Sequence, residues 1–101
     1  MGFNKKMIDS SVQIYCDGSK SIGFGHISRS LVLYNYLLIK NIEASIFGLT
    51  SEANEFLNTK SRENTDAKIV IFDSHSAVLN KLIRQNKNKT IITLDWFGNV
   101  I

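Results

Sequence analysis

Residues 21–30, SIGFGHISRS, bring two glycines, a histidine and an arginine together shortly after an apolar run, VQIYC. Gly23 and Gly25 have no Cβ atom, so the backbone can turn sharply here and approach a bound molecule closely. His26 can exchange a proton near neutral pH, and Arg29 can pair with an anion. These residue types predict a site where backbone meets a negatively charged ligand beside a catalytic histidine. A plain strand-to-helix turn is the alternative.

The spacing of the glycines argues against two common phosphate-binding loops. A P-loop needs Lys and then Ser or Thr after its last glycine, whereas Phe24 and Gly25 follow Gly23. A dinucleotide fingerprint, G-x-G-x-x-G/A, needs Gly or Ala at its third conserved position and an acidic residue at the end of the second strand. Here Ser28 stands third, and the second strand ends in Leu49–Thr50. We therefore expect an anion site at the start of the following helix, without NAD or another cofactor.

Three aspartates, Asp17, Asp73 and Asp95, each follow a predicted strand. Because parallel strands end at one edge of a sheet, their carboxylates can face the same crevice. Asp17 or Asp73 could orient the histidine of the glycine loop, although an Asp that starts a turn is also common after a strand. For Asp95 the turn is the favoured interpretation. The guanidinium of Arg29 suits a phosphate or Asp17 equally, and His75 is either a second base or ligand or a surface histidine.

Metal binding and disulfide formation are not expected from this sequence. His26, His75 and Cys16 lie far apart, and no cluster of His, Cys, Asp and Glu has the spacing of metal ligands. Cys16 is the only cysteine, which excludes an internal disulfide and fits a reducing compartment. At the end of an apolar run, it is more typical of a buried small side chain than of a nucleophile.

Length and composition indicate one small globular domain after a polar N-terminal tail, residues 1–10. The chain has 101 residues, of which 44% are hydrophobic and 21% charged. The net charge of +3 is scattered, with short clusters at Lys5–Lys6 and at Arg84, Lys87 and Lys89. We interpret these as solvated surface and expect no nucleic-acid partner. No apolar run reaches membrane-spanning length and no signal peptide is recognised, so we expect a cytoplasmic protein.

Hydrophobic patterning predicts alternating strands and helices, β-α-β-α-β-α-β. The strands are expected at 12–16, 44–49, 68–72 and 90–94, and the helices at 27–40, from Thr50 or Ser51 to about Thr59, and from Ser76 to about Asn86. This order predicts an α/β domain, 11–101, with a Rossmann-like open parallel sheet and helices on both faces. The segment 27–40 is apolar nearly all round, which predicts burial on more than one side.

The motif D-x-x-x-x-I-G-x-G-H-x-x-R-x-L-x-L resembles the amino-terminal half of a family of bacterial nucleotide-sugar hydrolases. The family removes UDP from a 2,4-diacetamido-2,4,6-trideoxy altrose in pseudaminic acid synthesis and is related to spore-coat polysaccharide proteins. This chain matches the motif at Asp17, Ile22, Gly23, Gly25, His26, Arg29, Leu31 and Leu33. The stretches IVIFDSHSA and IITLDWFGN also resemble family strands that end in Asp, so the resemblance covers residues 12–99. One departure is His75, where family members often have Tyr.

The resemblance implies a GT-B-type fold, in which two Rossmann-like domains face each other across a cleft. His26 would then be the general base that activates water, or an acceptor hydroxyl, at the reactive carbon of the sugar. A UDP-sugar would be bound by Asp17, Gly23, Phe24, Gly25, Arg29, Asp73 and His75. Hydrolysis is the activity favoured by the resemblance, and glycosyl transfer in surface-polysaccharide synthesis is the close alternative, because one scaffold hosts both.

A third hypothesis is a catalytically inert domain or split subunit. In GT-B enzymes the carboxyl-terminal domain usually grips the nucleotide, and the resemblance identifies this chain with the first domain only. The apolar 27–40 helix and the apolar residues 96–101 suggest surface that a further domain, or a second copy of the chain, would cover.

Overall fold

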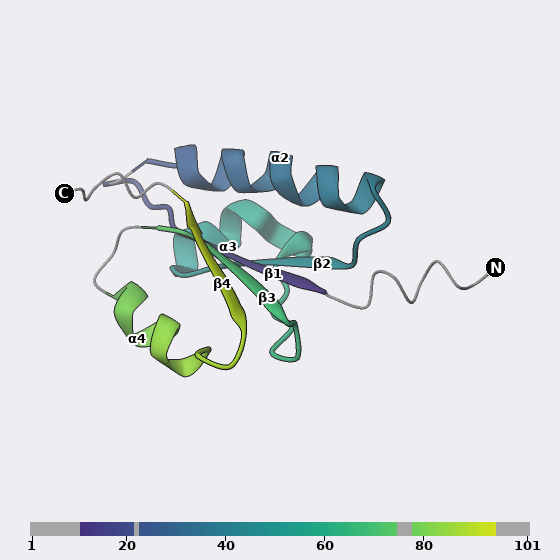
Figure 1. Ribbon diagram of the computed structural model, residues 1–101. Helices are drawn as coiled ribbons and strands as arrows, with labels where there is room; N and C mark the ends of the chain where they lie inside the picture. Colours follow the sequence, from purple (N-terminus) through teal and green to yellow (C-terminus); the bar gives the residue numbers. More distant parts are fainter. Residues whose placement is uncertain (1–10, 22, 75–77, 95–101) are drawn as a thin grey trace.

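The structure is a computed structural model, and it describes residues 11–21, 23–74 and 78–94. These form an α/β fold in which strands alternate with helices (Figure 1). The elements are β1 (Val12–Cys16), α2 (Gly25–Ile39), β2 (Ala44–Gly48), α3 (Ser51–Leu57), the 3-10 turn η1 (Asn58–Lys60), β3 (Ile69–Asp73), α4 (Val78–Gln85) and β4 (Thr90–Leu94).

The four strands form one all-parallel sheet in the order β2-β1-β3-β4. The chain leaves β1 toward β2 on one side and later returns to place β3 on the other side of β1. In open α/β sheets, ligands bind at such a reversal, outside the carboxyl ends of the strands. The register pairs Cys16 with Asp73, so the last residues of β1 and β3 lie side by side at this edge.

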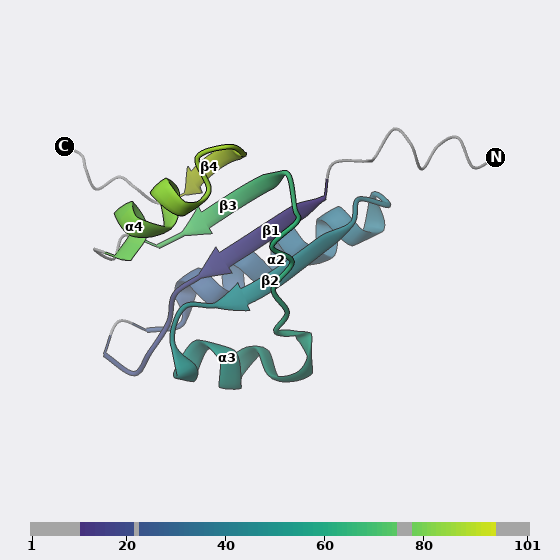
Figure 2. The ribbon, with the colours of Figure 1, turned by 90° about the horizontal axis from the view of Figure 1, so that it is seen from below.

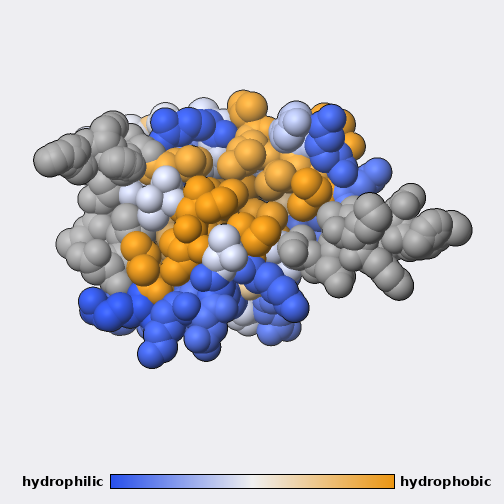
Figure 3. All heavy atoms as spheres, viewed as in Figure 1, coloured by the Kyte–Doolittle hydropathy of each residue, from blue (hydrophilic) through white to orange (hydrophobic). Residues whose placement is uncertain are grey.

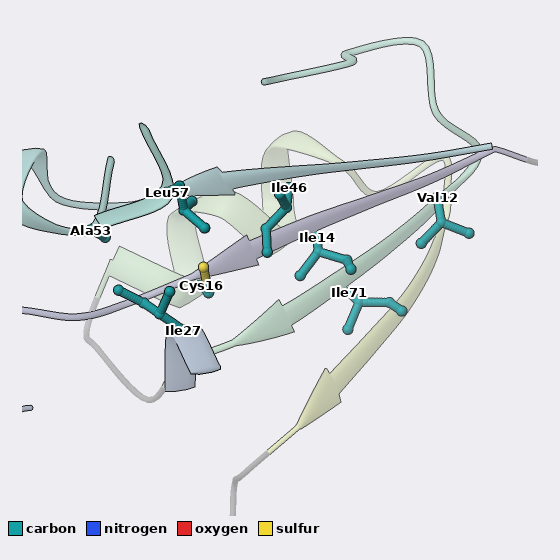
Figure 4. Packing of buried hydrophobic residues seen from close by; sticks show 8 residues of the cluster. All are labelled: Val12, Ile14, Cys16, Ile27, Ile46, Ala53, Leu57 and Ile71. Atoms are coloured by element: carbon teal, nitrogen blue, oxygen red, sulfur yellow. The ribbon is translucent and has the colours of Figure 1, made fainter. Parts of the chain in front are cut away.

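Helices lie on both faces of the sheet (Figures 1 and 2), as predicted. Helix α2 covers one face, α4 packs on the other, and α3 lies beside β2 at the edge of the sheet. Between the sheet, α2 and α3, eight buried residues form the larger core (Figure 4). They are Val12, Ile14, Cys16, Ile27, Ile46, Ala53, Leu57 and Ile71. On the opposite face, Tyr15, Val70 and Phe72 pack with Leu82 and Ile83 of α4.

The predicted order of strands and helices is confirmed over the described residues, and it is consistent with a Rossmann-like domain. Helix α2 begins at Gly25, two residues earlier than predicted, and β3 extends to Asp73. In these described ranges, no helix is long and apolar enough to cross a membrane. The predicted roles of His75 and Asp95 and the apolar 96–101 segment lie outside the described residues.

The prediction that α2 is buried on more than one side is wrong for this structure. Only Ile27 and Ser30 of the helix are fully buried, whereas Val32 is 70% and Ile39 is 76% exposed. Figure 3 shows apolar side chains gathered over α2 and β4 on one face of the molecule. The reason is geometric: the sheet and α3 contact one flank of the helix, and no other described element packs on its outer side.

Candidate functional site

The candidate site is centred on Asp73, the last residue of β3, at the edge where β1 and β3 end. Its side chain has no exposed surface. The N–H of Asp17, just beyond β1, donates to the carbonyl oxygen of Asp73 at 3.3 Å, so the two aspartates are tied together through the backbone. A buried carboxylate needs charged or polar partners, because burial without them is costly.

Three side chains of α2 supply those partners. The Nε atom of Arg29 donates to Oδ2 of Asp73 at 3.0 Å, and its Nη2 atom donates to Oδ1. His26 Nδ1 lies 2.8 Å from Oδ1, and the hydroxyl of Ser30 donates to Oδ2 at 3.0 Å. Burial alone would raise the pKa of this carboxyl, but the hydrogen bonds from its three partners and the positive charge of Arg29 hold the pKa below its ordinary value.

The helical repeat explains why these three residues reach one carboxylate. His26, Arg29 and Ser30 are spaced i, i+3 and i+4, which places them on one face of a helix. That face lies at the amino end of α2, next to the carboxyl end of β3. The spacing of these residues in the sequence thus places the three donors on one helix face. The acceptor, Asp73, lies 43 or more residues further along the chain and is brought to them by the sheet.

The contact with Asp73 defines which atom of the histidine is basic. The ionised carboxylate accepts hydrogen bonds only, and its Oδ1 lies closer to Nδ1, at 2.8 Å, than the donor Nη2 of Arg29 does, at 3.3 Å, so the proton on the ring is assigned to Nδ1. The basic atom of the neutral ring is then Nε2. The His26 side chain keeps 16% of its surface exposed, so a small molecule at the sheet edge can reach it. A ring held in one tautomer by a buried carboxylate is the arrangement of a general base.

Asp17 has a different role from Asp73 in this structure. Its Oδ1 accepts from the N–H of Gly18 at 2.9 Å, and its Oδ2 accepts from the hydroxyl of Ser74 at 3.0 Å. These bonds join the loop after β1 to the chain after β3. Of the two predicted orienters of His26, the structure therefore brings Asp73 to the ring. The guanidinium of Arg29 likewise binds Asp73, a partner that the sequence interpretation did not consider.

The structure requires glycine at some positions of the loop but not at others. Gly23 has φ +86°, a backbone conformation that favours glycine. It exchanges two backbone hydrogen bonds with Ser19, so its N–H is used within the loop. Gly18 touches Ile27, where a Cβ atom would lie 2.4 Å from the end of the buried side chain. Gly25 has neither restriction, and open space lies beside its Cα atom.

Phe24 lies beside a second feature of the same edge, a hollow of about 280 Å³. Its ring stacks on Phe56 of α3 with the ring centres 5.2 Å apart. Lys20, Glu52 and Glu55 complete the lining of the hollow. Phe24 also immediately precedes α2, and its side chain cannot accept a hydrogen bond from the first amides of that helix. The amino end of α2 therefore keeps the positive partial charge that attracts anions.

Cys16 is part of the core beneath the site. Burial, with a smaller contribution from the charge of Asp73, raises the pKa of its thiol to about 12. A thiol of this kind is a poor nucleophile at neutral pH. Within the described ranges no three His, Cys, Asp or Glu side chains are grouped as they would be around a metal ion.

Sequence reasoning found most of the polar residues at this edge but missed two. The structure brings His26, Arg29 and Asp73 together and places Asp17 next to them, whereas Phe24 is directed toward α3. The residues missed are Ser30 and Ser74. Each carried a usable signal, because Ser30 lies one helical turn after the histidine and Ser74 follows a strand-ending aspartate. His75 is outside the described residues.

Comparison with protein-family models, with curated proteins and with solved structures gave no match to this chain. Its function must therefore be inferred from the residues and their geometry.

Proposed function

We propose that this chain is the histidine-bearing domain of a nucleotide-sugar hydrolase that releases UDP from a 2,4-diacetamido-2,4,6-trideoxy sugar. It would correspond to the first of the two Rossmann-like domains of a GT-B fold. The observation that carries the proposal is the 2.8 Å contact between His26 Nδ1 and the buried Asp73 carboxylate. It lies at the reversal of strand order, where ligands bind in open α/β sheets.

The proposed reaction uses His26 as a base on water. Nε2 takes a proton from the water as its oxygen bonds to the anomeric carbon of the sugar. The bond between that carbon and the diphosphate oxygen breaks, and UDP leaves with the electron pair. Asp73 keeps the ring in the basic tautomer and stabilises the imidazolium that forms. A positioned base of this kind contributes about 10²–10⁴-fold to the rate.

Four features support an anionic sugar substrate at this edge. The amino end of α2 attracts a phosphate, and the open space beside Gly25 lets a phosphate approach the backbone closely. The guanidinium of Arg29 is paired with Asp73, but half of its side-chain surface is exposed, so it can also donate to a phosphate. The stacked rings of Phe24 and Phe56 form an apolar wall against which one face of a sugar can pack.

The proposal is tested by incubating the purified chain with the UDP-linked sugar in ¹⁸O-labelled water, without an acceptor. We expect free UDP, and free sugar that carries the label at its anomeric oxygen. The variant His26→Asn should be slower by about 10²–10⁴-fold, because the amide can still bond Asp73 but cannot take the proton. Asn35→Ala, at an exposed position of the same helix, is the control and should retain full activity.

Three outcomes would contradict the proposal in different ways. A fully active His26→Asn would remove this residue from the mechanism. Release of UDP only when an acceptor sugar is added would assign the site to a glycosyltransferase, with the same base acting on an acceptor hydroxyl. If UDP is not released under either condition and the UDP-sugar does not bind, the isolated chain is an inert domain.

A further inference from the structure

A second hollow lies at the opposite end of the sheet, next to the amino ends of β3 and β4. It is an open depression of about 790 Å³, within the size range of small-molecule sites. Its wall combines the segment before and into β3, 65–69, with the turn that leads from α4 into β4, 87–90. Strands rise about 3.3 Å per residue, so this hollow is about 13 Å along β3 from Asp73.

The wall of this hollow is strongly basic. Lys68, Lys87 and Lys89 line it, against a single carboxylate, Asp66. The local formal charge of +2 is most of the net charge of +3 that the whole chain carries. Lys87 and Lys89 belong to the cluster that the sequence interpretation treated as solvated surface. The fold adds Lys68, which is 19 or more residues away in the sequence.

Among the described residues, the side chains of these lysines form none of the hydrogen bonds that end α4. The carbonyl oxygen of Leu82 accepts from both the backbone N–H and the side-chain amide of Asn86, and the N–H of Lys89 donates back to Asn86. The ammonium of Lys89 instead donates to the carbonyl oxygen of Thr65, which joins the two walls of the hollow. Within the described chain, neither Lys68 nor Lys87 forms an ion pair with a carboxylate. Three like charges around one hollow repel each other, and a multivalent anion would relieve this repulsion.

We infer that this hollow is a second binding site, separate from the His26 site, for a small phosphorylated molecule. Lys68 and Lys87, which pair with no carboxylate among the described residues, supply the charges for the phosphate groups, and Lys89 joins the two walls and adds a third charge. Thr65 and Asn88 place neutral hydrogen-bonding groups in the same hollow, which suits the uncharged part of such a ligand.

Pyrophosphate is the probe for this site. We expect it to shift the amide resonances of residues 65–69 and 87–90 in ¹H–¹⁵N NMR spectra at low ionic strength. The double variant Lys68→Gln/Lys87→Gln, which keeps the bond from Lys89 to Thr65, should bind at least about tenfold more weakly. The double variant Lys60→Gln/Lys81→Gln is the matched control. It removes the same charge at exposed positions outside the hollow and should bind within about twofold of the original chain.

The outcomes separate a site from a general attraction of anions to a basic protein. Equal weakening in the two double variants would overturn the inference, because it would mean that only net charge matters. Shifts confined to the His26 edge, or no shifts at millimolar pyrophosphate, would overturn it as well. Circular dichroism spectra check that both double variants keep the fold, so that a loss of binding can be attributed to the removed charges.

Discussion

Replacing Asp73 by Asn tests the centre of the site most directly. Asn has nearly the same shape, but it carries no charge and presents an N–H₂ group in place of one acceptor oxygen. The carboxylate accepts hydrogen bonds from Arg29, His26 and Ser30 in this structure. The amide oxygen of Asn can still accept hydrogen bonds in place of one carboxylate oxygen. In place of the other oxygen, the N–H₂ group of Asn would face an N–H donor of Arg29, and no hydrogen bond could form there.

The loss can be worked out from these contacts. A hydrogen bond to a charged group contributes about 1.5–3 kcal/mol, and about two of them are lost or weakened. The Arg29 side chain is half exposed and can turn to water, which reduces the cost. We expect the free energy of unfolding to fall by about 2–4 kcal/mol at pH 7. For a domain of this size, that corresponds to a decrease of roughly 10–25 °C in Tm.

The stabilisation provided by Asp73 should depend on pH. The pKa of Asp73 is lower in the folded chain than its ordinary value, so its contribution to stability is fully present above that value. It is lost as the pH falls below about 4 and through the folded pKa. Urea denaturation of the original chain and Asp73→Asn at pH 7, 4 and 3 should therefore show a difference that shrinks with acidity.

The exposed Asp66→Asn is the control, with an expected change below about 0.5 kcal/mol. The reasoning is refuted if Asp73→Asn is as stable as the control at pH 7. It is equally refuted if the difference between the original chain and Asp73→Asn is the same at pH 3 as at pH 7.

Three further predictions concern the stability of the fold and the reactivity of its buried thiol. Gly48→Ala should lower the free energy of unfolding by about 1–3 kcal/mol, because the added Cβ atom would lie 2.6–2.9 Å from atoms of α3. Gly25→Ala is the control, since its Cβ atom would meet open space, and it should change the free energy of unfolding by less than about 1 kcal/mol. Thermal denaturation of the two variants checks the difference. The thiol of Cys16, buried and with its pKa raised to about 12, should react with a thiol reagent at pH 8 only as fast as the chain unfolds, and rapid labelling without denaturant would contradict this. Tyr15→Phe removes a 2.6 Å hydrogen bond to Glu63 and should cost about 0.5–1.5 kcal/mol in urea denaturation, and an unchanged midpoint would show that the bond adds nothing.

The elements could be predicted from the sequence because each has a strong local signal. The run at 69–72 is continuously apolar and largely β-branched, which is typical of a strand buried on both faces. Apolar residues recur with the spacing of one helix face at Val78, Leu79, Leu82 and Ile83. The extent of burial of α2 was not predictable in this way. Composition shows that a helix is apolar on every side, but it does not show how many neighbours the fold supplies.

The candidate site could be predicted as a set of residues but not as a geometry. Asp17 and Asp73 look equivalent in the sequence, since each follows a strand. The sheet register distinguishes them, because Asp73 is the last residue of β3 and faces α2, whereas Asp17 lies one residue beyond β1. Strand order is a long-range property that no short motif encodes. For the same reason, the placement of Lys68 and Lys87 around one hollow could not be predicted from the sequence.

The two ends of α2 are attached to the sheet by different forces. Its first turns are tied to β3 by the charged cluster at Asp73, whereas its last residues pack through partly buried apolar side chains, and Ile39 is largely exposed. In native-state hydrogen exchange, the helix should therefore open gradually from its carboxyl end, while the amides near Ser30 exchange only with wider unfolding. The proposed catalytic histidine and the residues that position it thus also anchor the amino end of α2 to the sheet.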